Sequence, residues 1–109
     1  MTRQSLESVR YTVCAKFSDP QIAQEWIDWL TDGHCAEVIA CGALNAEIVV
    51  LDREALSYEV RYDFPDRATF ESYEAEHAPR LRAEGLERFS AERGIAYART
   101  VGAVLYSAD

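Results

Sequence analysis

Hydrophobic and polar residues alternate in two stretches of the chain, and this alternation predicts two strands. Every second residue is hydrophobic from Val9 to Phe17, and the same period runs from Leu56 to Phe64. Successive side chains of a strand point to opposite faces of a sheet, so the pattern is typical of strands with one buried face. Two less regular hydrophobic runs, over Leu44–Leu51 and Ile95–Tyr106, predict the second strand and the end of the sheet, the latter as one strand or two.

The hydrophobic spacing changes to that of a helix after the first predicted strand. Ser18, Asp19 and Pro20 supply a capping oxygen and a first-turn proline, and hydrophobic residues then recur at helical spacing. Gly33 is predicted to end this helix, so that His34 would lie just beyond its C-terminus. The mixed segment 34–41 is expected to add another helical turn or two before the second strand.

A second helix is predicted to begin at Pro65 and Asp66. Pro79 lies inside its hydrophobic pattern, and a proline has no N–H to donate to the helix, so a kink or break is expected just before it. Gly94 is predicted to end this helix. Gly102 then indicates a bulge or bend in the last strand.

The order of elements is therefore βαββαβ, with the second and third strands joined as a hairpin by the polar turn at 52–55. This order predicts an α+β, ferredoxin-like fold, in which a four-stranded antiparallel sheet carries two helices on one face. The pattern leaves open which face meets the helices. One face carries charged residues (Arg10, Lys16, Glu59, Arg61, Asp63), and the other carries an aromatic stripe (Tyr11, Phe17, Tyr58, Tyr62, Phe64). The uncovered face is expected to pack against a second copy in a two-fold homodimer.

Size and composition limit the remaining possibilities. A chain of 109 residues, 49% hydrophobic and 28% charged, is expected to form one domain over residues 1–109, with residues 1–7 flexible. A net charge of −8 repels phosphate backbones and anionic lipids, so neither nucleic acid nor membrane is an expected partner. Three cysteines without a CxxC pair, no membrane-spanning run and no signal-like opening favour the cytoplasm.

Four segments resemble a known bacterial family. They are EWIDWL (25–30), His34, YEVRY (58–62) and EAEHAPRLRAEGLERF (74–89), of which EHAP-x-LR is the most specific. The family contains proteins of about a hundred residues of unknown function, grouped with the dimeric α/β-barrel superfamily. The resemblance implies a ferredoxin-like monomer whose sheet packs against its partner's, with a cavity beside the sheet. Relatives in that superfamily include cofactor-free monooxygenases, isomerases, decarboxylases, stress-response proteins and haem-handling proteins, so the fold does not fix the function.

Three residues are candidates for catalysis. His34 can act as a general base, or as a cation that caps a helix C-terminus. Arg61 can anchor a carboxylate or enolate while Tyr58 donates a hydrogen bond, or it can simply pair with a neighbouring acid. The candidates for lining a ligand cavity, which can equally be packing residues, are Trp26, Trp29, Tyr62 and His77. No metal site is expected, because His77 lies 11 residues into its helix, a climb of about 16 Å from the end nearest His34.

The leading hypothesis is a cytoplasmic homodimer that binds or transforms a small molecule without a cofactor in a cavity beside the sheet. One alternative is a non-enzymatic dimerisation or interaction module, in which the aromatic residues serve packing alone. Another is a haem-handling protein with His34 or His77 as an axial ligand. A ligand-binding protein requires a cavity of several hundred Å³, whereas an interaction module requires none.

Overall fold

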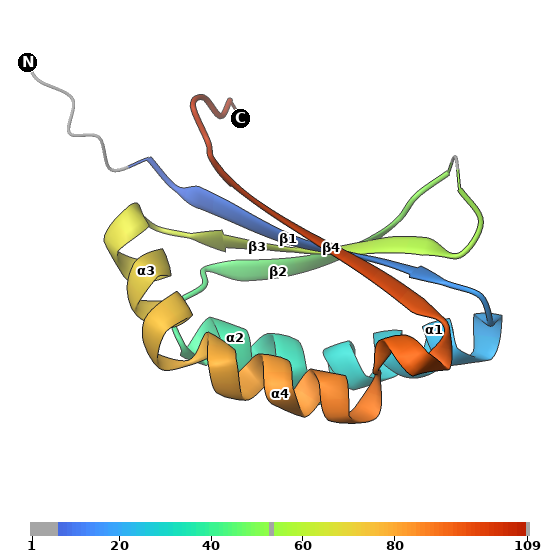
Figure 1. Ribbon diagram of the computed structural model, residues 1–109. Coiled ribbons are helices and arrows are strands. Elements are labelled where there is room, and N and C mark those ends of the chain that lie inside the picture. The colour runs from blue at the N-terminus through green and yellow to red at the C-terminus, as the bar shows by residue number, and fades with distance from the viewer. Residues whose placement is uncertain (1–6, 53, 109) are drawn as a thin grey trace, which may run out of the picture.

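The computed structural model describes residues 7–52 and 54–108, so most of the segment predicted to be flexible, residues 1–6, lies outside the described residues. Its four strands form one antiparallel sheet in the order β2-β3-β1-β4, and the helices cover one face of it (Figure 1). The strands are β1 (Val9–Phe17), β2 (Asn45–Val50), β3 (Ser57–Phe64) and β4 (Ile95–Ala103). The predicted hairpin of β2 and β3 and the α+β architecture are confirmed.

The first helical segment consists of two helices with a kink between them, as the sequence predicts. Helix α1 (Pro20–Trp29) begins as expected, with the Asp19 carboxylate accepting a hydrogen bond of 2.8 Å from the Gln21 N–H. A π-helical turn, η1 (Leu30–His34), follows, and within it the helical geometry is interrupted at Gly33, which takes φ 155°. Helix α2 (Cys35–Ala40) supplies the additional helical turns and buries Val38 completely. His34 lies directly after the kink, at the start of α2.

The second helical segment is interrupted just before Pro79, as the sequence predicts. Helix α3 (Arg67–Glu76) is capped by Asp66, whose carboxylate accepts from the Thr69 N–H at 2.8 Å. The chain leaves helical geometry at His77 and resumes as α4 (Ala78–Arg88), with a short 3-10 turn, η2 (Ala91–Arg93), before the last strand. The break lets two short helices follow the curved face of the sheet (Figure 1).

The last strand is single and continuous. It pairs with β1 from Phe17 opposite Ile95 to Val9 opposite Ala103 without an extra residue, so the bulge predicted at Gly102 is absent from this described ladder. Gly102 lies opposite Arg10, and a Cβ at this glycine would meet nothing within 4 Å. A glycine is therefore tolerated here, not required.

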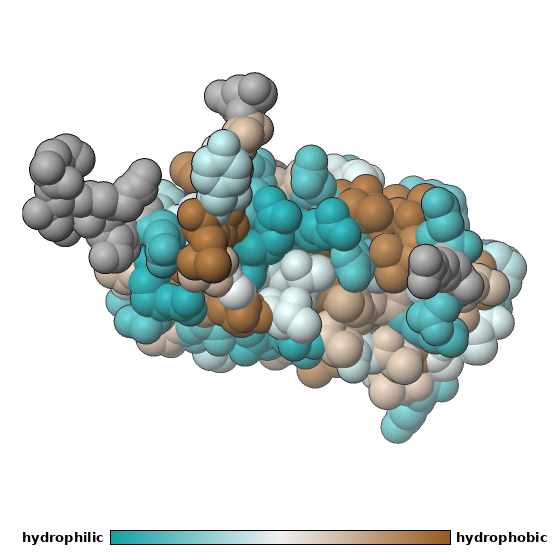
Figure 2. All heavy atoms as spheres, turned by 90° about the horizontal axis from the view of Figure 1, so that it is seen from above, coloured by the Kyte–Doolittle hydropathy of each residue, from teal (hydrophilic) through white to brown (hydrophobic). Residues whose placement is uncertain are grey.

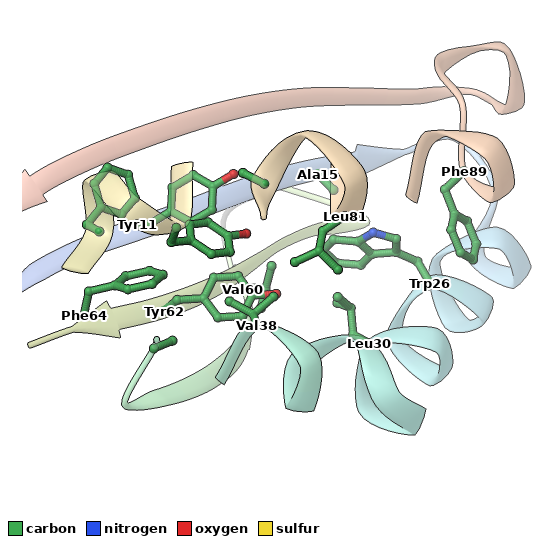
Figure 3. Packing of buried hydrophobic residues seen from close by; sticks show 14 of the residues in the cluster. Tyr11, Ala15, Trp26, Leu30, Val38, Val60, Tyr62, Phe64, Leu81 and Phe89 are labelled. Atoms are coloured by element: carbon green, nitrogen blue, oxygen red, sulfur yellow. The ribbon is translucent and has the colours of Figure 1, made fainter. Parts of the chain in front are cut away.

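The aromatic stripe is the face that meets the helices. Tyr11, Phe17, Tyr62 and Phe64 are all less than 5% exposed, and they pack with residues of the helical layer to form the core (Figure 3). Rings from sheet and helices contact one another, as in the 5.0 Å separation of the Phe64 and Tyr73 ring centroids. Aromatic burial is a large contribution to core stability, which accounts for the choice of this face.

The opposite face of the sheet carries the charged residues and has no cover in the described chain. Arg10 pairs with Asp63, and Arg61 pairs with Glu59, at 2.9 and 2.8 Å. Figure 2 shows this face, on which hydrophilic, weakly polar and hydrophobic residues are intermixed. On β4 its residues are small (Ala96, Ala98, Thr100, Gly102). In the part of the chain that the structure describes, no helix is long and apolar enough to cross a membrane.

Candidate functional site

A cavity of about 60 Å³ lies between the sheet and the helices. Side chains converge on it from both layers, as Tyr11, Tyr62, Trp26, Leu30 and Leu81 do in Figure 3. The volume holds a few water molecules and is far below the several hundred Å³ of a metabolite pocket. Its aromatic lining consists of Tyr11, Tyr62 and Tyr97 from the sheet and Trp26, Trp29 and Tyr73 from the helices.

Tyr11 is the centre of a polar cluster at one side of this cavity. Its hydroxyl oxygen accepts hydrogen bonds from Arg82 Nη2 of α4 at 3.2 Å and from Arg99 Nε of β4 at 3.1 Å. Arg82 Nη2 also donates to Glu74 Oε2 of α3, and the Arg82 guanidinium lies over the Tyr11 ring with its Cζ 5.7 Å from the centroid. Two arginines and one glutamate leave this cluster with a net positive charge, within a chain whose net charge is −8.

His34 forms another polar part of the lining. Its ring stacks on the Trp29 indole, with centroids 4.1 Å apart and planes inclined by 23°. Burial lowers the pKa of His34, opposed in part by the negative charges of Glu37 and Glu84. Arg80 pairs with both of these glutamates, at 3.7 and 3.3 Å. The imidazole is therefore neutral near pH 7, and a neutral imidazole can accept a proton.

Two buried nitrogen atoms of the lining have no hydrogen-bond partner among the described residues. They are His34 Nδ1 and Arg82 Nε. Buried polar atoms almost always have a partner, and an unsatisfied one costs about 1–3 kcal/mol. Both side chains line the same cavity, but the two nitrogen atoms themselves have almost no accessible surface, so a molecule bound there would reach them only after the lining has moved.

Two further tyrosines supply neutral hydroxyl groups. Burial raises the pKa of Tyr62 and of Tyr73 well above the ordinary tyrosine value. The Tyr62 hydroxyl lies 3.9 Å from Cys35 Sγ. These side chains therefore give the cavity aromatic surface without adding negative charge.

The structure brings together four of the seven residues singled out in the sequence. His34, Trp26, Trp29 and Tyr62 line the cavity. Tyr58 packs edge-on against Phe17, with ring centroids 5.8 Å apart. His77 lies at the junction of α3 and α4 and is not among the cavity-lining residues.

Arg61 lies on the opposite face of the sheet from Tyr58 and Tyr62. It lies on the uncovered face of the sheet, where its Nη2 and Nε both donate to Glu59, at 2.8 and 3.0 Å. The reason is the period of two along β3, which places residues 58, 60 and 62 on one face and residue 61 on the other. A single site composed of Tyr58, Arg61 and Tyr62 is therefore not present in the described chain.

None of the four residues of the polar cluster, Tyr11, Glu74, Arg82 and Arg99, is predicted as a site residue from the sequence. Arg82 ends the EHAP-x-LR segment that carries the family resemblance, and that was the available signal. Tyr11 looked like one more member of the aromatic stripe. Arg99 comes from a strand whose pairing with β1 could not be assigned in register without the structure.

The cavity in its present shape does not admit a haem. A cavity of about 60 Å³ is much smaller than a porphyrin ring, and His34 already stacks against Trp29 within it. Among the residues that the structure describes, no three His, Cys, Asp or Glu side chains are grouped as metal ligands.

Comparison with known proteins identifies a family and a fold. Residues 7–101 match the family model described as a domain of unknown function (DUF4286). A dimeric ferredoxin-like protein from an uncultured marine organism superposes with a TM-score of 0.75 at 16% identity, over 94% of this chain and 99% of the other. SnoaB, a cofactor-independent oxygenase from Streptomyces nogalater, gives 0.64 at 11% identity, over 93% and 96%. No curated protein matches the chain.

These findings confirm the predicted fold and the resemblance to a family of unknown function. At identities of 11% and 16% the solved structures establish the ferredoxin-like fold alone. They assign no activity to this chain, because one fold serves many functions.

Proposed function

The chain belongs to the DUF4286 family, and we propose that it is a homodimer that binds a small molecule with an anionic or weakly acidic oxygen between its sheet and its helices. The observation that supports this most directly is the pair of unpartnered buried nitrogens, His34 Nδ1 and Arg82 Nε, on two side chains that line one cavity. A protein that used this space for packing alone would gain stability from apolar side chains there.

The electrostatics favour an oxygen of negative character. Arg82 and Arg99 converge on one hydroxyl oxygen, and only one carboxylate, Glu74, pairs with them. Charge-assisted hydrogen bonds from guanidinium groups are about twice as strong as neutral ones. A ligand oxygen beside Tyr11 would therefore be bound more tightly as an anion.

The cavity must widen to admit such a ligand. Leu86 of α4 is 47% exposed and Trp29 of α1 is partly buried, and both line the cavity. Leu86 can move towards solvent, whereas Trp29 stacks on His34 and packs against Phe89, so we expect the opening to begin at Leu86. Widening here would leave the sheet unchanged.

Pairing of two chains through the uncovered face of the sheet is the second part of the proposal. A ferredoxin-like protein with a TM-score of 0.75 to this chain is described as dimeric. The small residues of β4 and the paired charges of β1 and β3 allow a second sheet to approach closely. Isologous two-fold dimers are also the commonest oligomer.

The small volume of the cavity favours one competing function. A dimerisation or interaction module needs no ligand. The cavity of about 60 Å³ would then be a packing defect filled with water. Under that alternative, removal of Arg82 or His34 would change stability and nothing else.

A thermal-shift screen against small organic acids and phenols separates these functions. A ligand at a hundred times its dissociation constant adds about 2.7 kcal/mol, which raises the melting temperature by about 10 °C or more for a domain of this size. Arg82→Gln should abolish the shift, whereas Arg67→Gln, an exposed arginine at the start of α3, should leave it unchanged. A flat screen would favour the interaction module, and a shift insensitive to Arg82→Gln would place the ligand outside this cavity.

A further inference from the structure

We propose that the ligand is a phenol or an enol, and that the site takes the proton of its hydroxyl group onto His34 Nδ1 and holds the resulting oxyanion beside Tyr11 and Arg82. This inference rests on the proposed function and adds to it a ligand class and a proton transfer. It follows from which hydrogen-bonding capacities of the site are already used.

Tyr11 has only a donor left to offer. A guanidinium group can only donate, so the contacts from Arg82 and Arg99 occupy the two lone pairs of the Tyr11 oxygen. The hydroxyl proton takes part in neither contact. Tyr11 is therefore a hydrogen-bond donor whose O–H bond is polarised by two cations.

The two unpartnered nitrogens complete the pattern. Arg82 Nε carries an N–H and is a donor, whereas Nδ1 of a neutral imidazole protonated on Nε2 is an acceptor. A matching ligand must accept from Tyr11 and Arg82 and must donate to His34. A carboxylate only accepts, and an ammonium group only donates. A hydroxyl group both accepts and donates. Its oxygen must also stabilise the negative charge that remains when the proton is lost, as the oxygen of a phenol or an enol does.

The charges around the site fit the products of the transfer. The ligand O–H bond breaks and its electron pair stays on the oxygen, while an N–H bond forms at His34. Only a proton moves, so no oxidant or reductant is needed. The oxyanion then faces the net positive cluster of Tyr11, Arg82, Arg99 and Glu74. The imidazolium is stabilised by the negative charges of Glu37 of α2 and Glu84 of α4, which Arg80 offsets in part because it pairs with both.

The apolar part of the lining suits a flat ring. Trp29 stacks on His34 already, and the Tyr11 and Tyr62 rings lie stacked at 6.0 Å between centroids. A planar ligand can pack against such surfaces in the offset geometry that aromatic rings prefer.

The experiment uses 4-nitrophenol, whose phenolate absorbs visible light, and its methyl ether 4-nitroanisole, which has no proton to give. Each is titrated with the protein at a pH one unit below the solution pKa of the phenol, and binding is measured separately by calorimetry. We expect the bound phenol to be mostly phenolate, which requires its pKa to fall by at least about one unit, a tenfold change in its ionisation. The ether should bind at least about tenfold more weakly.

Substitutions assign the proton acceptor. His34→Gln should still bind the phenol but should lose the phenolate absorbance, and His77→Gln, the other histidine, should behave as the unsubstituted protein does. If His34→Gln does not fold, ¹⁵N shifts of the imidazole in the unsubstituted protein provide the same test, because ligand binding should protonate His34 Nδ1.

Two results would overturn the inference and leave the proposed function in place. One is binding of 4-nitrophenol without ionisation, or with ionisation that persists in His34→Gln. The other is a failure of phenols to bind while a carboxylate gives an Arg82-dependent thermal shift. If no compound shifts the melting temperature, the proposed function fails as well.

Discussion

At the scale of single residues, His34 connects the site to the pH dependence of folding. Burial lowers its pKa below the value of about 6.5 in an unfolded chain, so the unfolded state binds more protons between the two values. Stability therefore rises with pH in this window. Acidification from about pH 7 therefore lowers the free energy of unfolding progressively, until the pH is below the pKa of His34 in the folded state.

We predict that His34→Gln flattens this dependence. Urea denaturation between pH 7 and 5 should show a free energy of unfolding that falls more steeply for the unsubstituted protein than for the variant. His77→Gln serves as the control and should keep the original slope. Equal slopes in all three proteins would mean that another group titrates in this range.

Tyr11 has a different role, because its hydroxyl oxygen is the shared acceptor of two charged donors. We predict that Tyr11→Phe lowers the free energy of unfolding by about 1–3 kcal/mol, since it leaves both guanidinium groups without that acceptor. The double variant with Arg99→Gln should lose less than the sum of the two single changes, because they share one interaction. Additive losses in urea denaturation would show that the Arg99 contact contributes nothing.

At the scale of elements, Gly85 determines how closely α4 approaches α1. A Cβ at this position would lie 3.2 Å from Cη2 of Trp29, the indole that stacks on His34. Alanine in a helix interior is normally more stable than glycine by about 1 kcal/mol. Here the added methyl group has to displace the Trp29 ring by a few tenths of an ångström.

We predict that Gly85→Ala gives less than that stability gain and changes the environment of Trp29. In a Trp26→Phe background, Trp29 is the only indole of the chain, so a shift of its emission maximum reports the displacement. The same measurements on Ala83→Gly, at an exposed position of the same helix, give the difference in helix propensity between alanine and glycine without a neighbouring ring. A gain of about 1 kcal/mol in the free energy of unfolding, with unchanged emission, would show that the methyl group does not displace the Trp29 ring.

Most elements could be predicted from the sequence because their signals are local. The period of two in β1 and β3, the Asp19 and Asp66 caps and the break before Pro79 each depend on residues close together in the chain. Gly33 is a further local signal, because a glycine takes the positive φ of 155° at which the helical geometry is interrupted, as predicted.

The site was harder to predict because its contacts are distant in the sequence. Tyr11 and Arg99 are 88 residues apart, and Tyr11 and Arg82 are 71 apart. Residue type alone drew attention to the tryptophans, the histidines and Arg61. Only the pairing of β4 with β1 and the position of α4 decide which of the charged side chains reaches the cavity.

At the scale of the whole molecule, the two faces of the sheet differ in the residues that they carry. The face towards the helices carries the core and the cavity, and the other carries paired charges and the small residues of β4. Substitutions on the uncovered face should therefore change association of chains without changing the hydrogen bonds of Tyr11. This separation makes the two parts of the proposed function independently testable.

We predict that Ala98→Arg separates the dimer into folded monomers. Ala98 lies opposite Cys14, midway along the edge strand β4 on the uncovered face, and a long charged side chain there would hold a second sheet away and lose its hydration on contact. Sedimentation equilibrium should give the mass of two chains for the unsubstituted protein and of one for the variant. Ala36→Arg, on the exposed side of α2, keeps the charge change while leaving the face untouched, and should remain dimeric. A monomeric unsubstituted protein, or a dimer that survives Ala98→Arg, would mean that this face is not the interface.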